Sequence, residues 1–152
     1  SLVGSEMCIR DSSKPEFADP KYLHTHRNRI EDIQSGVDVT FNGKDYPKSL
    51  ISTKARSNDY SNFDLDKKYS TLNYTAAWAS NIPNSGGVGV IEVYLNDGLR
   101  DRVTVKPGEA KKRSADIRGG GRVEIVMYAV DKVDDKRQVN SNGLAMLTPT
   151  LK

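Results

Sequence analysis

The sequence predicts an all-β protein, an antiparallel jelly-roll-type β-sandwich of about eight strands. Two observations support this prediction. From Gly36 onward, short segments alternate apolar and polar residues, which is the pattern of strands with one buried face. Turn residues interrupt these segments about every 8–12 positions, the spacing of a sandwich or barrel, and no helical period competes with them.

The strands are expected in a simple order along the chain. Residues 37–41 alternate and stop at Asn42-Gly43, a strong hairpin signal, and residues 46–53 form the returning strand. Residues 54–67 are polar and are expected to be mostly loop. The remaining strands are expected at residues 68–79, 88–95, 99–105, 110–117, 122–130 and 143–151. Pro149 suggests that the last of these is an edge strand, because proline cannot donate a hydrogen bond to a neighbouring strand.

The N-terminal part differs from the rest. Residues 1–12, SLVGSEMCIRDS, show neither strand alternation nor a periodic apolar face. They resemble a recurrent spurious translation found at the ends of environmental sequence fragments, so we expect them to be non-native. Residues 13–35 are polar, with Pro15 and Pro20, and are expected to form a linker, or alternatively an arm with a short helix near residues 20–33. The sandwich is expected to span residues 36–152.

Composition and charge argue against two classes of partner. The chain has 152 residues, which fits one domain, and its 23 basic and 20 acidic residues give a net charge of +3. The two signs are mixed along the chain, whereas nucleic-acid-binding proteins concentrate positive charge, so no nucleic-acid partner is expected. No apolar run approaches the roughly 20 residues of a membrane helix, so no membrane insertion is expected. The single cysteine, Cys8, does not indicate a compartment.

The order of several strand and turn segments resembles the NPCBM family, the novel putative carbohydrate-binding module. The matching segments are residues 39–46 (VTFNGKDY), 69–72 (YSTL), 90–98 (VIEVYLNDG), 122–126 (RVEIV) and 143–147 (GLAML). The resemblance implies a galactose-binding-like β-sandwich, fused to other domains in a larger secreted or surface protein, with a glycan as partner. The chain departs from the family at residues 141–144 (SNGL), where an acidic or aromatic residue is common near the last strand.

Residue types for catalysis are missing from the predicted sandwich. The two histidines, His24 and His26, lie before it and Cys8 lies in the first segment, so no Ser/His/Asp or Cys/His arrangement can form. We therefore expect no enzyme and no cofactor. A structural Ca²⁺ bound by Asp131, Asp134 or Asp135 and by loop carbonyls is an open alternative, although neighbouring lysines argue against it.

Strand direction predicts where a ligand would bind. If successive strands alternate in direction, loops 42–45, 80–87, 106–109 and 131–142 share one end, and residues 54–66, 96–98 and 118–121 share the other. Amide, hydroxyl, carboxylate and guanidinium groups on the first end are of the types that bind sugar hydroxyls, although the same residues are also common loop formers. These candidate ligand-binding residues are Asn81, Asn84, Ser85, Asp131, Arg137, Asn140 and Asn142.

Trp78 is the candidate aromatic platform, because an aromatic face can stack on a sugar ring. Its spacing from Leu72, Tyr74 and Ala76 instead places it on the face expected to be the core, so both interpretations stay open.

Two functions follow from these observations. The first is a non-catalytic carbohydrate-binding module that engages glycans through the loop end. The alternative is a protein-interaction or structural spacer domain of a bacterial multidomain protein, using an exposed apolar strip formed by Val126, Tyr128 and Val130.

Overall fold

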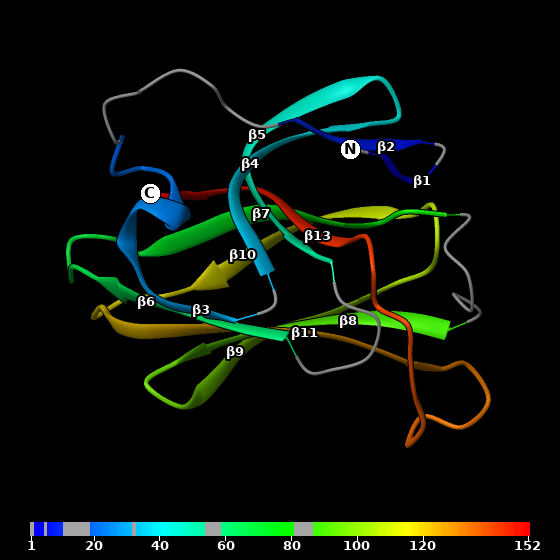
Figure 1. Cartoon of the computed structure of the whole chain (residues 1–152). Helices are drawn as coiled ribbons and strands as arrows, with labels where there is room; N and C mark the ends of the chain where they lie inside the picture. The colour runs from blue at the N-terminus through cyan, green and yellow to red at the C-terminus, as the bar shows by residue number, and fades with distance from the viewer. Residues whose placement is uncertain (1, 5, 11–18, 32, 54–58, 81–86) are drawn as a thin grey trace.

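The computed structural model describes residues 2–4, 6–10, 19–31, 33–53, 59–80 and 87–152. Within this part, thirteen strands and one short 3-10 helix form two antiparallel sheets that pack face to face (Figure 1). This confirms the predicted all-β sandwich. The described residues include no helix that is long and apolar enough to cross a membrane.

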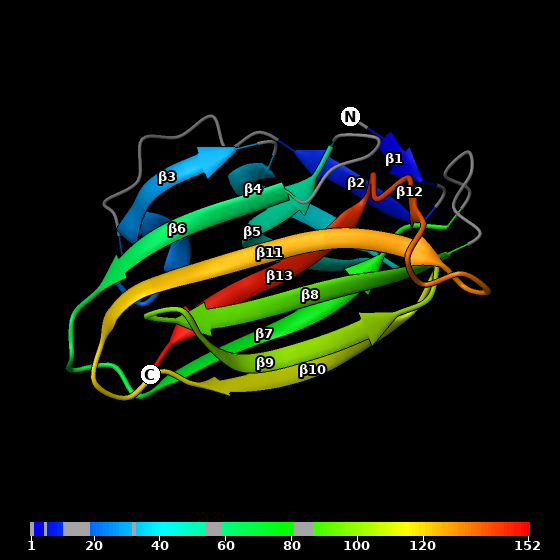
Figure 2. The ribbon, with the colours of Figure 1, turned by 90° about the horizontal axis from the view of Figure 1, so that it is seen from below.

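The two sheets differ in the number and order of their strands, which can be followed in Figures 1 and 2. The first contains, in spatial order, β1 (Leu2–Gly4), β2 (Met7–Arg10), β4 (Ile33–Phe41), β5 (Lys44–Ser52), β13 (Leu144–Leu151), β7 (Thr71–Trp78) and β10 (Ala110–Asp116). The second contains β3 (Arg27–Glu31), β6 (Asp59–Leu65), β11 (Gly121–Asp131), β8 (Gly87–Leu95) and β9 (Gly98–Val105), with β12 (Gln138–Val139) paired to β11. The 3-10 helix η1 spans Leu23–His26.

The main core lies between the two sheets, where the alternation of the sequence placed it. On β7, the predicted inward residues are all buried, and they pack with the buried alternate residues of β11 and β8. The inward residues of β7 are Leu72, Tyr74, Ala76 and Trp78, and those of β11 are Val123, Ile125, Met127 and Ala129. Each large side chain buried here stabilises the fold by about 1.5–3 kcal/mol relative to exposure.

A second, smaller core covers the opposite face of β7 and β13. The hairpin β4–β5 folds back over this face (Figure 1), and Lys48, at φ 57°, lies where β5 bends. Ala77 and Ala145, both small, allow the hairpin to approach closely. The buried members of this second core are Met7, Ile9, Val39, Phe41, Ile51, Ala77, Ala79, Ala145 and Leu147. Because these strands are buried on both faces, residues 76–79 and 144–147 are continuous apolar runs.

The N-terminal segments form strands where the sequence predicted a linker. β3 pairs with β6, and β4 begins at Ile33, so the boundary expected at Gly36 falls inside a strand. The short helix left open as an alternative near residues 20–33 is limited to the four residues of η1. β2 pairs with β4 and buries Met7 and Ile9. These segments form strands because they pair with strands distant in the sequence, although their local pattern does not indicate a strand. That residues 1–12 are non-native stays a prediction.

The loop expected at residues 54–67 contains a strand. β6 pairs with β11 along its whole length, and it buries Ser61, Phe63 and Leu65 on one face. Polar Ser61 occupies a core position, and its neighbours Asn62 and Asp64 are polar, so the segment lacks an apolar signal. Because β6 crosses the molecule, this segment does not lie wholly at the second end: Ser52 lies beside Gly143 at the first end, and Leu65 pairs with Gly121 at the second.

A buried polar group connects the edges of the two sheets. The Tyr74 hydroxyl on β7 donates to Asp101 Oδ2 on β9 at 2.7 Å, and Arg113 on β10 donates to both carboxylate oxygens. Asp101 is only 8% exposed. Burial would raise the pKa of Asp101, but the hydrogen bonds from Arg113 and Tyr74 outweigh it and hold that pKa below its usual range. Burial and the bond to Asp101 raise the pKa of Tyr74.

We expect Asp101→Asn to lower the free energy of unfolding by about 1–3 kcal/mol at pH 7, because Arg113 loses its charged partner. Urea unfolding measures this. Asp97→Asn is the control, since the pair of Asp97 with Arg122 is exposed and is worth about 0–1 kcal/mol.

The difference in stability between wild type and Asp101→Asn should also depend on pH. The pKa of Asp101 is lower in the folded than in the unfolded chain, so its stabilisation is complete above the unfolded value of about 3.9. It is lost as pH falls through the folded value. The difference in stability between wild type and Asp101→Asn should therefore shrink below about pH 4; a difference that grew on acidification would contradict this assignment.

Candidate functional site

Two of the loops expected at one end of the sandwich meet there. The Trp78 backbone N–H donates to Glu109 O at 3.2 Å, and Gly108 N–H donates to Trp78 O at 2.7 Å. The indole Nε1–H of Trp78 donates to Asn142 O at 3.0 Å. Loops 106–109 and 140–143 therefore surround the end of β7, as the strand directions predicted.

Trp78 itself is a core residue. It is fully buried, with its ring among the inward residues of both sheets. No face of the ring is free to stack on a sugar, so the core interpretation of Trp78 is confirmed and its place among the ligand-binding residues is corrected. Its indole N–H fixes loop 140–143 instead.

The other predicted loop residues mainly bond to their own loop. Asp131 Oδ1 accepts hydrogen bonds from the backbone N–H groups of Val133 (2.7 Å) and Asp134 (3.2 Å), which lower the pKa of Asp131. Arg137, 69% exposed, donates to Asp131 Oδ2 at 3.3 Å. Asn140 Oδ1 accepts from Asn142 N–H at 2.9 Å.

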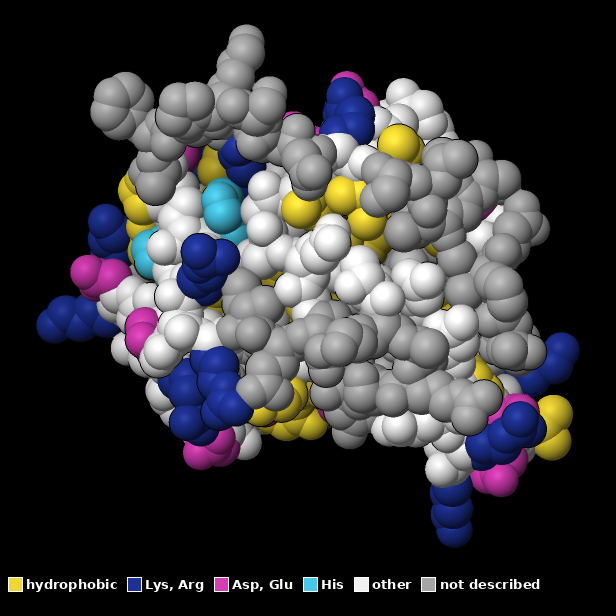
Figure 3. All heavy atoms as spheres, in the orientation of Figure 1, with side chains coloured by type: hydrophobic (Ala, Val, Ile, Leu, Met, Phe, Trp, Pro, Cys, Tyr) yellow, Lys and Arg dark blue, Asp and Glu magenta, His cyan; other side chains and the backbone are white. Residues whose placement is uncertain are grey.

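Three predicted residues, Asn81, Asn84 and Ser85, lie outside the described residues, and their role stays a prediction. Asn142 Oδ1 is buried and has no hydrogen-bond partner among the described residues. No group of three His, Cys, Asp or Glu residues that could hold a metal occurs in the described part of the chain. Figure 3 shows the two histidines, in cyan, on one surface of the molecule, with basic and acidic side chains mixed around its margin.

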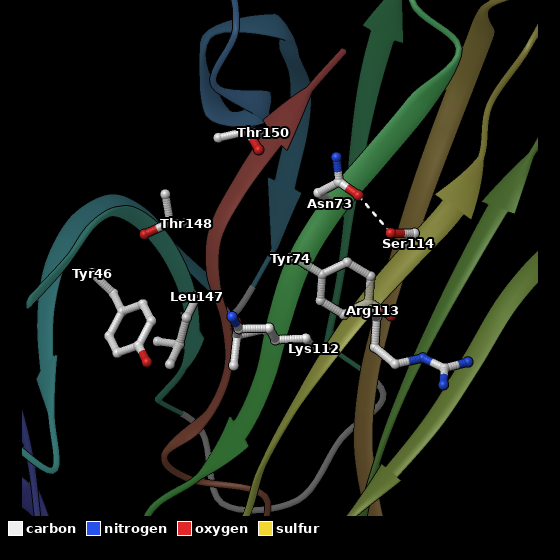
Figure 4. A pocket seen from close by; sticks show the side chains of 10 residues that line it. Tyr46, Asn73, Tyr74, Lys112, Arg113, Ser114, Leu147, Thr148 and Thr150 are labelled. Carbon is white, nitrogen blue, oxygen red and sulfur yellow. Dashed lines mark hydrogen bonds between the residues drawn. The ribbon is translucent and has the colours of Figure 1, made fainter. Parts of the chain in front are cut away.

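A hollow of about 400 Å³ lies elsewhere, on the outer face of the first sheet (Figure 4). Its floor is formed by outward-facing residues of two paired strands: Asn73 is opposite Ser114, and Thr75 is opposite Lys112. Its wall is formed by Tyr46 of β5 and by three residues of β13, Leu147, Thr148 and Thr150. We call this hollow the groove.

An irregularity in β13 builds the wall of the groove. The register of β13 against β7 shifts between Leu147 and Thr150, and Thr148 adopts a left-handed backbone with φ 43°. Hydrogen bonds hold this residue to the bend of β5: its N–H donates to Ser49 Oγ at 3.0 Å and its hydroxyl donates to Pro47 O at 2.9 Å. Pro149 therefore lies in a bulge of a central strand, and the edge position expected from it is wrong.

Some of the polar groups in the groove bond to each other and others do not. Ser114 Oγ donates a hydrogen bond to Asn73 Oδ1 at 2.5 Å. Within the described residues, no hydrogen bond uses the hydroxyls of Tyr46, Thr75 and Thr150 or the amino group of Lys112. In Figure 4, Lys112 extends across the hollow toward Leu147, and Tyr46 stands on the far side of Leu147.

Sequence reasoning missed the groove because its residues come from four strands far apart in the chain. From the sequence, Asn73, Thr75 and Lys112 are each expected on the solvent-facing side of an ordinary strand. Only the bulge at Thr148 and the bend at Lys48 place Tyr46 beside them. The described lining includes no carboxylate, histidine or cysteine, and its hydroxyl, amide and amino groups can donate hydrogen bonds to a ligand.

The strip proposed for protein interaction lies on the outer face of the second sheet. Val126, Tyr128 and Val130 are half-buried by neighbouring side chains. In Figure 2, β11 runs across this face with no described element over it. A role for this face in binding a protein stays a prediction.

Solved structures with a similar fold include carbohydrate-binding modules. The CBM51 module of the GH95 protein from Clostridium perfringens, in complex with methyl-galactose, matches with a TM-score of 0.57 at 14% identity, over 86% of this chain and 98% of that one. The chain shares the fold of a carbohydrate-binding module. No family model matches the sequence, and no curated protein matches it.

Two larger structures of ZmpB from the same organism also match. One contains the CBM51-2 and INT domains, with a TM-score of 0.54 at 10% identity over 95% of this chain and 41% of that one. The other contains the M60 catalytic domain with CBM51-1 and CBM51-2, with a TM-score of 0.53 at 13% identity over 93% and 18%. The chain therefore spans less than half the length of either, and at these identities the likeness shows the fold alone.

The burial of Trp78 can be measured directly, because it is the only tryptophan in the chain. We expect its fluorescence emission to be blue-shifted and poorly quenched by acrylamide in the folded protein, and to shift to the red on unfolding. An emission that acrylamide quenches as readily as free tryptophan would contradict the core position and return Trp78 to the candidate ligand residues.

Proposed function

We propose that this chain is a non-catalytic carbohydrate-binding domain and that it binds a glycan in the groove. The observation that supports this most strongly is an aromatic residue, Tyr46, in the wall of a groove whose floor carries hydroxyl, amide and amino groups. Among the described residues, the Thr75 hydroxyl and the Lys112 amino group of this floor make no hydrogen bond. Sugars need both kinds of contact, because a pyranose ring has an apolar C–H face and a rim of hydroxyls that donate and accept hydrogen bonds.

The positions of these groups suit recognition by a rigid surface. Asn73, Thr75 and Ser114 project from paired strands, so their spacing is fixed by the sheet before any ligand arrives. Tyr46 is half-buried against the second core, and Lys44 Nζ lies 5.3 Å from the centre of its ring. Its hydroxyl and the part of the ring that lines the groove can contact a ligand with little loss of side-chain entropy. The groove is an open hollow, so the affinity for a short glycan is expected to be modest.

The loop end remains the competing place for the same function. Arg137 is exposed there, and the sequence predicts residues 80–87 at the same end. Against this site, Trp78 is buried and the Asp131 carboxylate already accepts three hydrogen bonds from its own loop.

The wider context of the domain is part of the proposal. The solved modules that share its fold include parts of longer chains. Together with the resemblance to the NPCBM family, this supports a domain fused to others in a larger secreted or cell-surface protein, where it holds that protein on a glycan.

Removing the aromatic wall tests the groove. We expect Tyr46→Ala to weaken binding of the best ligand from a glycan array by about tenfold, or about 1.4 kcal/mol, because the ring contact and one hydroxyl are lost. Isothermal titration calorimetry measures the affinity, and urea unfolding shows that the variant is folded.

Two further variants locate the binding surface. Tyr128→Ala, on the outer face of the second sheet, is the matched control and should leave the affinity unchanged. Arg137→Ala probes the loop end. Loss of binding in Arg137→Ala with full binding in Tyr46→Ala would reject the groove, and an array with no bound glycan would reject the function.

A further inference from the structure

A second hollow continues the groove along β7 and β10. It also has a volume of about 400 Å³ and is lined by Ser70, Thr71, Ala115, Asp116, Arg118 and Ser114. Ser114 lines both hollows, so they meet there. From Thr71 to Thr75, four residues of β7 cover about 13 Å, which is longer than one sugar ring. The continuous surface therefore suits a chain of sugars.

The charges along this surface are one-sided. Lys112 has no hydrogen bond or ion pair within the described residues, and no Asp or Glu lines the groove. In the second hollow, Asp116 is neutralised by Arg118, which donates to both of its oxygens. Those hydrogen bonds lower the pKa of Asp116 to about 2, so the pair stays ionised and balanced. The unbalanced charge is the ammonium of Lys112.

The strands around Lys112 add positive charge. Residues 100–118 contain seven Lys or Arg and three Asp or Glu, a net charge of +4, against +3 for the whole chain. Most of these residues belong to β9 and β10, which lie side by side, as the hydrogen bond from Lys111 Nζ to Thr104 O shows. Four of the basic residues pair with carboxylates: Arg102 with Glu92, Lys111 with Glu109, Arg113 with Asp101 and Arg118 with Asp116. The positive charge that lines the groove without such a partner among the described residues is that of Lys112. An unpaired ammonium attracts anions.

We infer that the ligand of the groove is an acidic polysaccharide, whose carboxylate or sulfate pairs with Lys112 while its hydroxyls bind the floor along β7 and β10. This inference rests on the proposed function. Lysine offers three donors and no acceptor, so it pairs better with an anion than with a neutral hydroxyl. A nucleic acid fits less well, since single strands are usually bound by several stacked aromatic residues. Two tyrosines line the groove, and one of them, Tyr74, is buried in the core.

The test compares four ligands by calorimetry at low salt. These are a galacturonate oligosaccharide, a sulfated heparin oligosaccharide, a neutral galactan oligosaccharide of the same length, and single-stranded DNA of matching charge. We expect at least one acidic oligosaccharide to bind about tenfold tighter than the neutral one, as one charge-assisted hydrogen bond would give. Carboxylate and sulfate are distinguished by which of the two acidic ligands binds. Affinity should fall as salt rises.

Two matched variants assign the effect to the groove. Lys112→Gln should weaken the acidic ligand by about tenfold and leave a neutral ligand nearly unchanged. Lys111→Gln makes the same change of charge on the same strand, at a side chain directed to β9, and should weaken binding less than about twofold. Both lysines are exposed, so both variants should fold.

The other possible results of these titrations each reject either the acidic ligand or the proposed function. Equal binding of neutral and acidic oligosaccharides, with no effect of Lys112→Gln, would overturn the acidic ligand and leave the proposed function intact. DNA bound as tightly as the glycan, or equal losses in both lysine variants, would show unspecific attraction of polyanions and also overturn it. Binding of none of the oligosaccharides would overturn the acidic ligand, and the proposed function is overturned with it when the glycan array also shows no bound glycan.

Discussion

The burial of β7 and β13 on both faces over half their length determines much of this structure. At the Trp78 end of β7, one face meets the second sheet and the other meets the hairpin β4–β5. The hairpin can cover this face only because β5 bends at Lys48, and because Ala77, Ala79 and Ala145 leave room for it. Apolar burial favours this cover, and the small side chains set how closely it packs.

The same cover explains where the groove lies. The covering hairpin β4–β5 ends at Leu147 and Thr148, where β13 bulges and Thr148 donates hydrogen bonds to Pro47 O and Ser49 Oγ. Beyond that step the outer face of β7 and β10 is open and polar, with Asn73, Thr75 and Lys112 on it. The edge of the covering layer is thus the wall of the groove, and Tyr46 belongs both to the second core and to the wall. The residues at this boundary therefore contribute both to the stability of the fold and to the groove. The edges of the two sheets are joined at another place, through Asp101.

Local pattern was enough to predict the sandwich, the inward face of β7 and the turn at Asn42-Gly43, whose positive φ angles suit these residues. It was also enough to bring loops 106–109 and 131–142 to one end. It could not predict β3 and β6, since polar segments become strands there only by pairing with distant partners. Nor could it predict the groove, which depends on the bulge at Thr148, or the internal bonds of Asp131, which are set by loop geometry.

Mapping the bound glycan on the isotope-labelled domain by NMR tests directly whether the groove is the binding site. We predict that an acidic oligosaccharide shifts the backbone amide signals of Asn73, Thr75, Lys112 and Ser114, together with Tyr46, and leaves those of β12 and the strip at Val126–Val130 unchanged. Shifts confined to Arg137, Asn140 and Asn142, with none on β7 or β10, would contradict it and place the binding site at the loop end.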